Sequence, residues 1–171
     1  MPMLACHEAV ERPIVGIYRR VGPNDEAMTS SERFSAIAAA LDEVYRSNFW
    51  RNKARFEDAR ARLSQSSKLQ PSWDTYGGDP PNPTAVAIAA RVLNLLEVEA
   101  LPPARLLPSS EGGIAISFVR GTFRAEIEVY NTGEIVAATY TPQDLPSVWE
   151  LESSDAAIRT TIEQIRVHFT A

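Results

Sequence analysis

The sequence has few of the residues that bind metals or form disulfides, and it has no long apolar run. Its 171 residues include one cysteine, Cys6, and two histidines, His7 and His168. One cysteine forms no disulfide within the chain, and one cysteine with two histidines is too few for the roughly four ligands of a zinc site. No apolar stretch approaches the roughly 18 residues that a membrane-spanning helix needs. We therefore expect no bound metal, no cofactor and no membrane partner.

The sequence also lacks the common catalytic motifs. It contains no Gly-x-Ser-x-Gly elbow, no Walker-type phosphate loop and no Gly-x-Gly-x-x-Gly motif. Cys6 and His7 are adjacent, and adjacent side chains of an extended segment point in opposite directions, which disfavours a catalytic pair. The sequence therefore favours a non-enzymatic protein over an enzyme.

The first ten residues lack the basic start and apolar stretch of a secretory signal. Together with the single cysteine, this favours a reducing compartment, and we predict a cytoplasmic protein. A hydrophobic content of 44% is ordinary for a globular protein of this length. The chain is long enough for one domain with an appendage.

The charged residues are segregated along the chain. The formal net charge of -5 is made up of -3 in residues 1–45, +4 in residues 46–62 and -6 in residues 63–171. An acidic protein is unsuited to indiscriminate nucleic-acid binding, but the basic block leaves a specific contact open.

Residues 31–67 are predicted to form a long amphipathic helix. Thr29 and Glu32 have the spacing of a capping box, and neither glycine nor proline interrupts the segment from 31 to 64. At about 1.5 Å per residue the helix is roughly 50 Å long, so it either breaks near Ser47-Asn48 or extends beyond a small domain and needs a partner helix. Its apolar residues recur on one face in steps of three and four, with Asn52 at the one polar step. They are Phe34, Ala38, Leu41, Tyr45, Phe49, Phe56, Ala59 and Leu63.

Other faces of this helix are basic. The candidate partner-binding residues are Trp50, Arg46, Arg51, Lys53, Arg55, Arg60 and Arg62. Tryptophan and arginine are favoured at interface hot spots, and arginine also binds phosphates. A solvated face, a protein partner and a nucleic-acid partner are all compatible with this pattern.

Residues 65–81 form a connector that contains the sequence Trp-Asp-Thr-Tyr-Gly-Gly-Asp-Pro. We expect an ordered loop in which Trp73 and Tyr76 hold Gly77 and Gly78 against the body. Asp74 and Asp79 flank Tyr76, and two carboxylates in a loop suit acid–base chemistry or simply cap turns. Asn82 and Pro83 then begin an apolar helix that is buried on more than one side.

The C-terminal half predicts an antiparallel sheet and a last helix. Apolar and polar residues alternate over 114–119 and 123–130, and the third strand covers 135–140. A fourth strand over 149–152 is possible on the same pattern, and Ser153 or Ser154 caps an amphipathic C-terminal helix. Glu126, Glu128 and Tyr130 share the polar face of the sheet and form a second candidate interface.

These elements predict an α+β fold with a long N-terminal helix, a buried second helix, a three- to four-stranded antiparallel meander and an amphipathic C-terminal helix. We divide the chain into an N-terminal arm or short strand (1–30), the long helix (31–67) and a compact α+β domain (68–171).

The loop at 73–80, the proline-started helix and the Glu111-Gly112-Gly113 start of the meander resemble a group of small uncharacterised bacterial and phage-associated proteins. Those proteins carry a Trp-Asp-Gly-Tyr-Gly-Ala loop, a helix and a Gly-Gly-initiated sheet, and the resemblance covers roughly residues 70–152. Here Thr75 and Gly78 replace the usual glycine and alanine. The resemblance implies a shared fold and a bacterial or phage origin.

We therefore predict a protein–protein interaction module: an accessory, inhibitor, antitoxin or immunity-type subunit, of the kind found in phage defence. Its partner is another protein or a second copy, bound through the long helix. One alternative is a small hydrolase that uses Asp74, Asp79 and Tyr76. The other is a nucleic-acid-binding accessory protein that uses the basic face of the helix.

Overall fold

The chain divides into two units, Met1–Tyr45 and Arg46–Ala171, and the computed structural model describes residues 29–170. The predicted arm or strand at residues 1–30 lies outside this range, apart from its last two residues. Within the first unit the described residues are 29–45, which form the start of helix α1.

Helix α1 (Ser30–Ser66) is continuous, so of the two alternatives for this segment, a break near Ser47-Asn48 or one long helix, the break does not occur. The capping box at its start is confirmed: the Glu32 amide donates to the Thr29 hydroxyl, and the Thr29 amide donates to the Glu32 carboxylate (2.7 Å). These bonds satisfy amide groups that a helix N-terminus leaves without partners.

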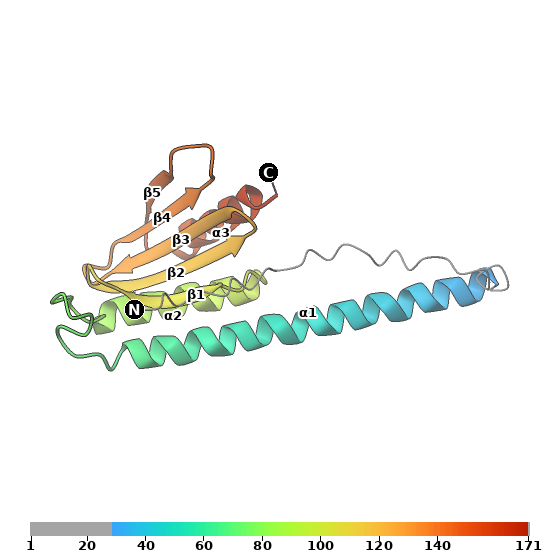
Figure 1. Ribbon diagram of the computed structural model, residues 1–171, viewed down its shortest axis with the longest axis horizontal. Helices are drawn as coiled ribbons and strands as arrows, with labels where there is room; N and C mark the ends of the chain where they lie inside the picture. The colour runs from blue at the N-terminus through green and yellow to red at the C-terminus, as the bar shows by residue number, and fades with distance from the viewer. Residues whose placement is uncertain (1–28, 171) are drawn as a thin grey trace, which may run out of the picture. The chain divides into compact units, whose positions relative to one another are not determined.

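The second unit is built on a five-stranded antiparallel sheet (Figure 1). Its strands, in the spatial order of the sequence, are β1 (Arg105–Ser109), β2 (Gly113–Arg120), β3 (Phe123–Tyr130), β4 (Ile135–Tyr140) and β5 (Ser147–Leu151). The α+β class is confirmed, but the predicted count of three to four strands is wrong. Strand β1, which was not predicted, pairs with β2 at the edge of the sheet, and the suggested fourth strand is β5.

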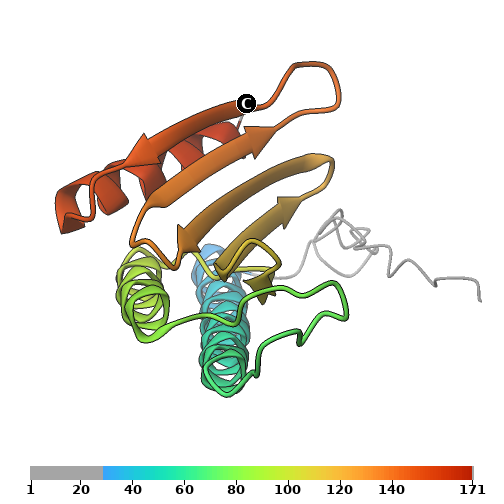
Figure 2. The same ribbon diagram turned by 90° about the vertical axis from the view of Figure 1, so that its left-hand side faces the viewer.

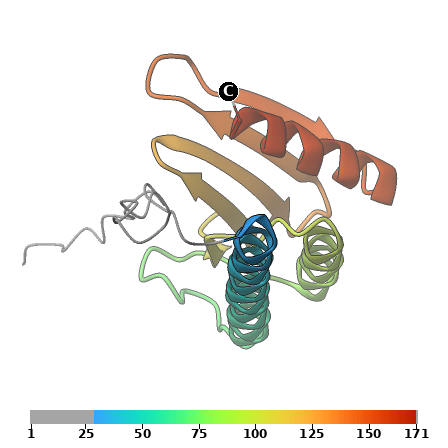
Figure 3. The same cartoon turned by 90° about the vertical axis from the view of Figure 1, so that its right-hand side faces the viewer.

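Helices α2 (Pro83–Val98) and α3 (Asp155–His168) cover one face of this sheet, α2 over β2 and β3 and α3 over β4 and β5 (Figures 2 and 3). Both predicted N-caps are present. The Asn82 side chain accepts a hydrogen bond from the Ala85 amide, and the Ser154 side chain accepts one from the Ala157 amide.

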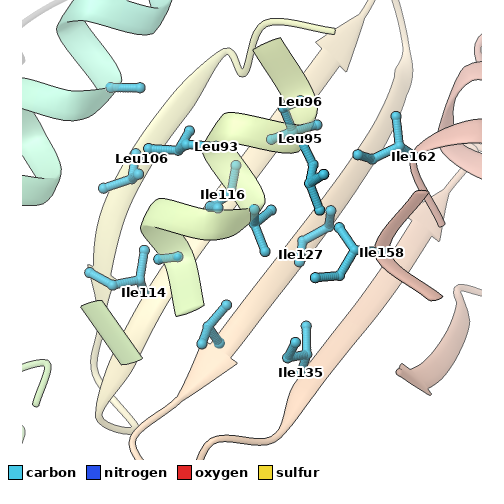
Figure 4. Packing of buried hydrophobic residues seen from close by; sticks show 14 of the residues in the cluster. Leu93, Leu95, Leu96, Leu106, Ile114, Ile116, Ile127, Ile135, Ile158 and Ile162 are labelled. Carbon is cyan, nitrogen blue, oxygen red and sulfur yellow. The ribbon is translucent and has the colours of Figure 1, made fainter. Parts of the chain in front are cut away.

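The covered face of the sheet forms the hydrophobic core (Figure 4). Strand register aligns Ile116, Ile127 and Ala137 across β2, β3 and β4, and all three side chains are buried. Leu93 from α2 and Ile158 from α3 pack in the same cluster. Each such leucine or isoleucine contributes about 1.5–3 kcal/mol when fully buried. The alternating sequence pattern thus identified the inner face correctly.

Two asparagines join the start of α2 to the turn between β3 and β4. The Asn131 side chain accepts a hydrogen bond from the Asn82 amide (2.7 Å) and donates one to the Pro80 carbonyl (3.0 Å). In return the Asn82 side chain donates to the Asn131 carbonyl (2.8 Å). This cluster fixes the loop before α2 against the end of the sheet.

The glycine pair at the start of β2 lies beside this cluster. Gly112 has a φ of +84° and Gly113 a φ of +148°, a range that side-chain-bearing residues rarely adopt. A Cβ atom on Gly113 would lie 2.1 Å from the Val129 carbonyl oxygen, and one on Gly112 would lie 2.8 Å from the Asn131 side-chain nitrogen. Both positions therefore require glycine for space as well as for conformation.

Candidate interaction surfaces

The start of α1 exposes a row of large apolar side chains, which we call the apolar row. In the first unit its members are Phe34, Ile37, Leu41, Val44 and Tyr45. Phe34 is 75% exposed and Tyr45 is 76% exposed. Successive members are three or four residues apart, except for the neighbours Val44 and Tyr45. Because this spacing keeps residues on one side of a helix, the side chains form one broad strip along α1.

Further along the same helix, within the second unit, the equivalent strip is still exposed at Phe49 and is buried from Phe56 onward. Phe56, Ala59 and Leu63 are 2%, 3% and 6% exposed, and they belong to the hydrophobic core. Steps of three and four connect this strip to the apolar row, because a helix turns by about 100° per residue. One amphipathic pattern therefore runs through α1, buried at its end and exposed at its start.

Trp50 lies at the N-terminal end of the second unit and is exposed, as predicted from its position off the apolar strip. Its ring packs edge-on against Phe49, with ring centroids 5.5 Å apart. The Lys53 ammonium group lies 5.2 Å from the Trp50 ring centroid, within the range of a cation–π interaction. Phe49 is itself 63% exposed, so this group is an apolar and cationic patch on the helix surface.

The basic residues of α1 do not behave as one surface. Arg46, Arg51 and Arg55 are exposed, but Arg60 bonds to α2 through the carboxylate of Glu97 and the side-chain oxygen of Asn94, and this raises the pKa of Arg60 and lowers that of Glu97. A second set of contacts lies within α1: Arg62 pairs with Asp58 (2.7 Å), and Lys53 lies 3.9 Å from Glu57. Arg60 thus stabilises the packing of α1 on α2, and its partner Glu97 was not recognised in the sequence.

The loop at 73–79 uses Asp74 to hold its own shape. One carboxylate oxygen of Asp74 accepts hydrogen bonds from the amides of Tyr76 (3.0 Å) and Gly78 (2.8 Å). The Trp73 indole is half-buried and donates to the Asp79 carbonyl (3.4 Å). This geometry is that of an Asx-type turn in which the carboxylate substitutes for a backbone acceptor.

Tyr76 does not hold the loop against the body, contrary to expectation. Its side chain is 94% exposed, whereas the side chain of Trp73 is half-buried and bonds within the loop to the Asp79 carbonyl. A Cβ atom on Gly78 would lie 2.6 Å from the Asp74 carboxylate, which explains the glycine there. Gly77 has a φ of +89° and open space around it, so only its conformation requires glycine.

Thr75 holds strain in this loop, because it has a φ of 63° and a β-branched side chain. We expect Thr75→Gly to raise the free energy of unfolding by about 0.5–1 kcal/mol, since relief of roughly 1–2 kcal/mol of strain exceeds the entropic cost of glycine. Thermal unfolding measured by circular dichroism tests this. Thr75→Ala is the control, because it shortens the side chain but keeps the Cβ atom. A thermal unfolding midpoint for Thr75→Gly at or below the wild-type value would show that the backbone of Thr75 is not strained.

The face of the sheet opposite helices α2 and α3 carries the second predicted interface. Glu126, Glu128 and Tyr130 lie together there, as their alternation predicted, and Glu128 accepts hydrogen bonds from the Tyr130 hydroxyl (2.9 Å) and the Ser109 hydroxyl. With Tyr140 they line part of a hollow of about 180 Å³. Sequence reasoning missed Ser109 and Tyr140, because only strand register brings β1 and β4 next to these glutamates.

The environment of this hollow disfavours negative charge. Burial raises the pKa of Glu126, and the neighbouring Glu128 carboxylate raises it further. Burial and the hydrogen bond to Glu128 raise the pKa of Tyr130 to about 12, and burial raises the pKa of Tyr140. The polar side of the sheet is therefore partly desolvated around Glu126.

The raised pKa of Glu126 gives a pH prediction. A carboxyl group with a higher pKa in the folded state contributes stability at low pH that is lost as pH rises through that pKa. Glu126→Gln is therefore expected to raise the melting temperature at pH 7 to 8, and the gain should shrink towards pH 4. Melting curves at several pH values check this, with the exposed Glu134→Gln as a control. A gain that is equal at every pH would contradict it.

A hollow of about 310 Å³ lies at the end of the sheet beside the asparagine cluster. Its lining residues are Glu111, Gly112, Tyr130, Asn131, Thr132 and Glu134. Within residues 29–170, no group of three or more histidine, cysteine, aspartate or glutamate side chains is arranged to hold a metal ion. None of the helices in that range combines the length and apolarity needed to cross a membrane.

No protein family, curated protein or solved structure matches this chain. The candidate surfaces are therefore judged by their own geometry.

Proposed function

We propose that this protein is a non-enzymatic interaction module, of the accessory or inhibitor type, and that the apolar row of α1 is its docking surface. The observation that carries the proposal is the exposure of Phe34, Ile37, Leu41, Val44 and Tyr45 along successive turns of one helix. Amphipathic helices that dock on partners present their anchors with this spacing.

The energetics support a docking role for this row. Full burial of a large apolar side chain contributes about 1.5–3 kcal/mol, so several neighbouring exposed side chains represent a substantial free-energy gain for any partner that covers them. Isolated exposed apolar residues are ordinary on monomers, but a contiguous strip of them marks interaction surfaces. Tyr45, Phe49 and Trp50 add the aromatic residues that are favoured at interface hot spots.

The alternative functions have less support. The Asp74 carboxylate is engaged by two backbone amides, which suits a structural role better than catalysis. On the basic face, Arg60 and Arg62 are paired with Glu97 and Asp58, which reduces the positive charge available to phosphates.

A photo-crosslinking amino acid at position 45 tests the proposal in the cells that make the protein. We expect this crosslinker to form covalent adducts with the partner protein, because the partner lies against position 45 when it is docked on the apolar row. Substitution of Leu41 by glutamate in the same chain should abolish those adducts, since a charge in the middle of the row must be desolvated on docking.

The same crosslinker at Leu145 is the matched control, because Leu145 is 91% exposed and belongs to the loop between β4 and β5, outside the apolar row. The proposal fails if position 45 gives no protein adducts, or if its adducts persist unchanged in the Leu41→Glu chain.

A further inference from the structure

We infer that the occupant of the apolar row is a second copy of this chain, bound through α1 in antiparallel orientation; this rests on the docking role proposed above. The row is self-complementary. Phe34, Ile37, Leu41 and Val44 follow the 3–4–3 spacing of a helix–helix seam, and Asn48 occupies the next position of that repeat. Polar positions therefore limit the apolar seam to the start of α1.

The exposed area is sufficient for a dimer. Aromatic side chains bury roughly 150–250 Å² each, so Phe34, Tyr45 and Phe49 at 63–76% exposure present on the order of 400 Å² in one copy. Two copies that face each other would bury about twice that from aromatic side chains alone. The aliphatic residues of the row bring the interface above the roughly 1,000 Å² expected of a specific association.

Charge selects the antiparallel orientation. Residues 46–62 carry a net charge of +4, of which the Arg60–Glu97 pair offsets one. A parallel pair would align this basic block with its own copy at the roughly 10 Å spacing of packed helices. An antiparallel pair with its two-fold axis near Leu41 separates the centres of the two blocks by roughly 40 Å along the helix axis. That distance is several times the roughly 8–10 Å screening length of physiological salt, so the repulsion disappears.

The same axis lets the row cover itself. Leu41 lies near the middle of the stretch from Phe34 to Phe49, so it meets Leu41 of the second copy. Phe34 of one copy then lies beside Asn48 and Phe49 of the other. Each end of the row in one copy is thereby covered by the opposite end of the row in the second copy.

The mass of the purified full-length chain, measured by light scattering and sedimentation over a range of concentrations, tests the dimer. We expect a dimer for the wild type and for Leu145→Glu, and a monomer with an unchanged circular-dichroism spectrum for Leu41→Glu. Glutamate is a good helix former, so this exposed substitution preserves α1.

Engineered cysteines in a Cys6→Ser chain test the orientation. A mixture of Phe34→Cys and Asn48→Cys chains is expected to give the mixed disulfide dimer under oxidising conditions. Phe34→Cys alone is expected to give none, because the two substituted positions are then about 21 Å apart, beyond the roughly 7 Å limit for a disulfide.

The failures are distinguishable. A disulfide dimer from Phe34→Cys alone would overturn the antiparallel arrangement. A monomer at every concentration, with position 45 crosslinking to a different protein, would overturn the second copy as occupant and leave the docking role intact. A monomer whose melting temperature falls in Leu41→Glu and which gives no adducts to another chain would overturn both, because the row would then be covered by the chain's own residues.

Discussion

Replacement of Gly113 by alanine is expected to cost at least about 3 kcal/mol of folding stability, enough to remove a large part of the stability of an ordinary domain. The new Cβ atom would lie 2.1 Å from the Val129 carbonyl oxygen and 3.0 Å from the Tyr130 Cα atom, and both of these are backbone atoms. Relief of the clash requires β2 and β3 to separate where Gly113 and Tyr130 are paired. Urea unfolding followed by circular dichroism measures the loss.

Gly121→Ala is the matched control for this substitution. Gly121 also has a positive φ, of 60°, but a Cβ atom there meets nothing within 4 Å. Its replacement should therefore cost only the conformational strain of about 1–2 kcal/mol. Equal losses for the two variants would show that conformation, and not the contact with Val129, dictates glycine at position 113.

Asn131→Ala is expected to have the second-largest effect, a loss of about 2–3 kcal/mol. It removes the acceptor for the Asn82 amide and the donor to the Pro80 carbonyl, both of which are partly buried. Each lost hydrogen bond costs about 0.5–1.5 kcal/mol, and more where its partner is left without water. Hydrogen exchange should localise the effect, with faster exchange of the amides at the start of α2.

Two further variants separate the parts of this loss. Asn131→Asp keeps an acceptor for the Asn82 amide but sets a carboxylate oxygen against the Pro80 carbonyl, so it should remain destabilising. Thr132→Ala changes the same turn but removes only two exposed hydrogen bonds, one from its hydroxyl to the Glu134 carboxylate and one from the Glu134 amide to its hydroxyl, so it should cost clearly less than Asn131→Ala. A loss in Thr132→Ala equal to that in Asn131→Ala would assign the effect to the turn and not to the cluster.

Local signals predicted much of the fold. Helix caps at Thr29, Asn82 and Ser154 could be recognised because each bond lies within three residues of the cap. The period of two in β2 and β3 identified the buried face, because successive side chains of a strand point to opposite faces of the sheet. Strands β1 and β5 are each five residues long and lie at the edges of the sheet, so they are defined mainly by the neighbour with which they pair.

The features that sequence reasoning missed depend on contacts between distant residues. Asn131 looked like an ordinary turn residue, yet its side chain bonds 49 positions away to Asn82. Glu128 looked solvated, yet the hydroxyl of Ser109 reaches it across β2, where Ala115 is small. Three members of the apolar row, Phe34, Leu41 and Tyr45, were by contrast predicted from spacing alone, because helical periodicity needs no knowledge of the fold. The other two members, Ile37 and Val44, were not part of the predicted stripe.

The neighbour-by-neighbour order of the strands has a consequence for how the protein is made. Every strand pairs with the one before it, so β1 to β5 can assemble hairpin by hairpin as they leave the ribosome. Helix α2 is synthesised earlier but its N-terminus has no anchor until Asn131 emerges. Strands β1 to β3 precede this turn in the chain, so α2 can pack on them before its N-terminus is fixed. The β3–β4 turn therefore completes the attachment of the start of α2 to the sheet.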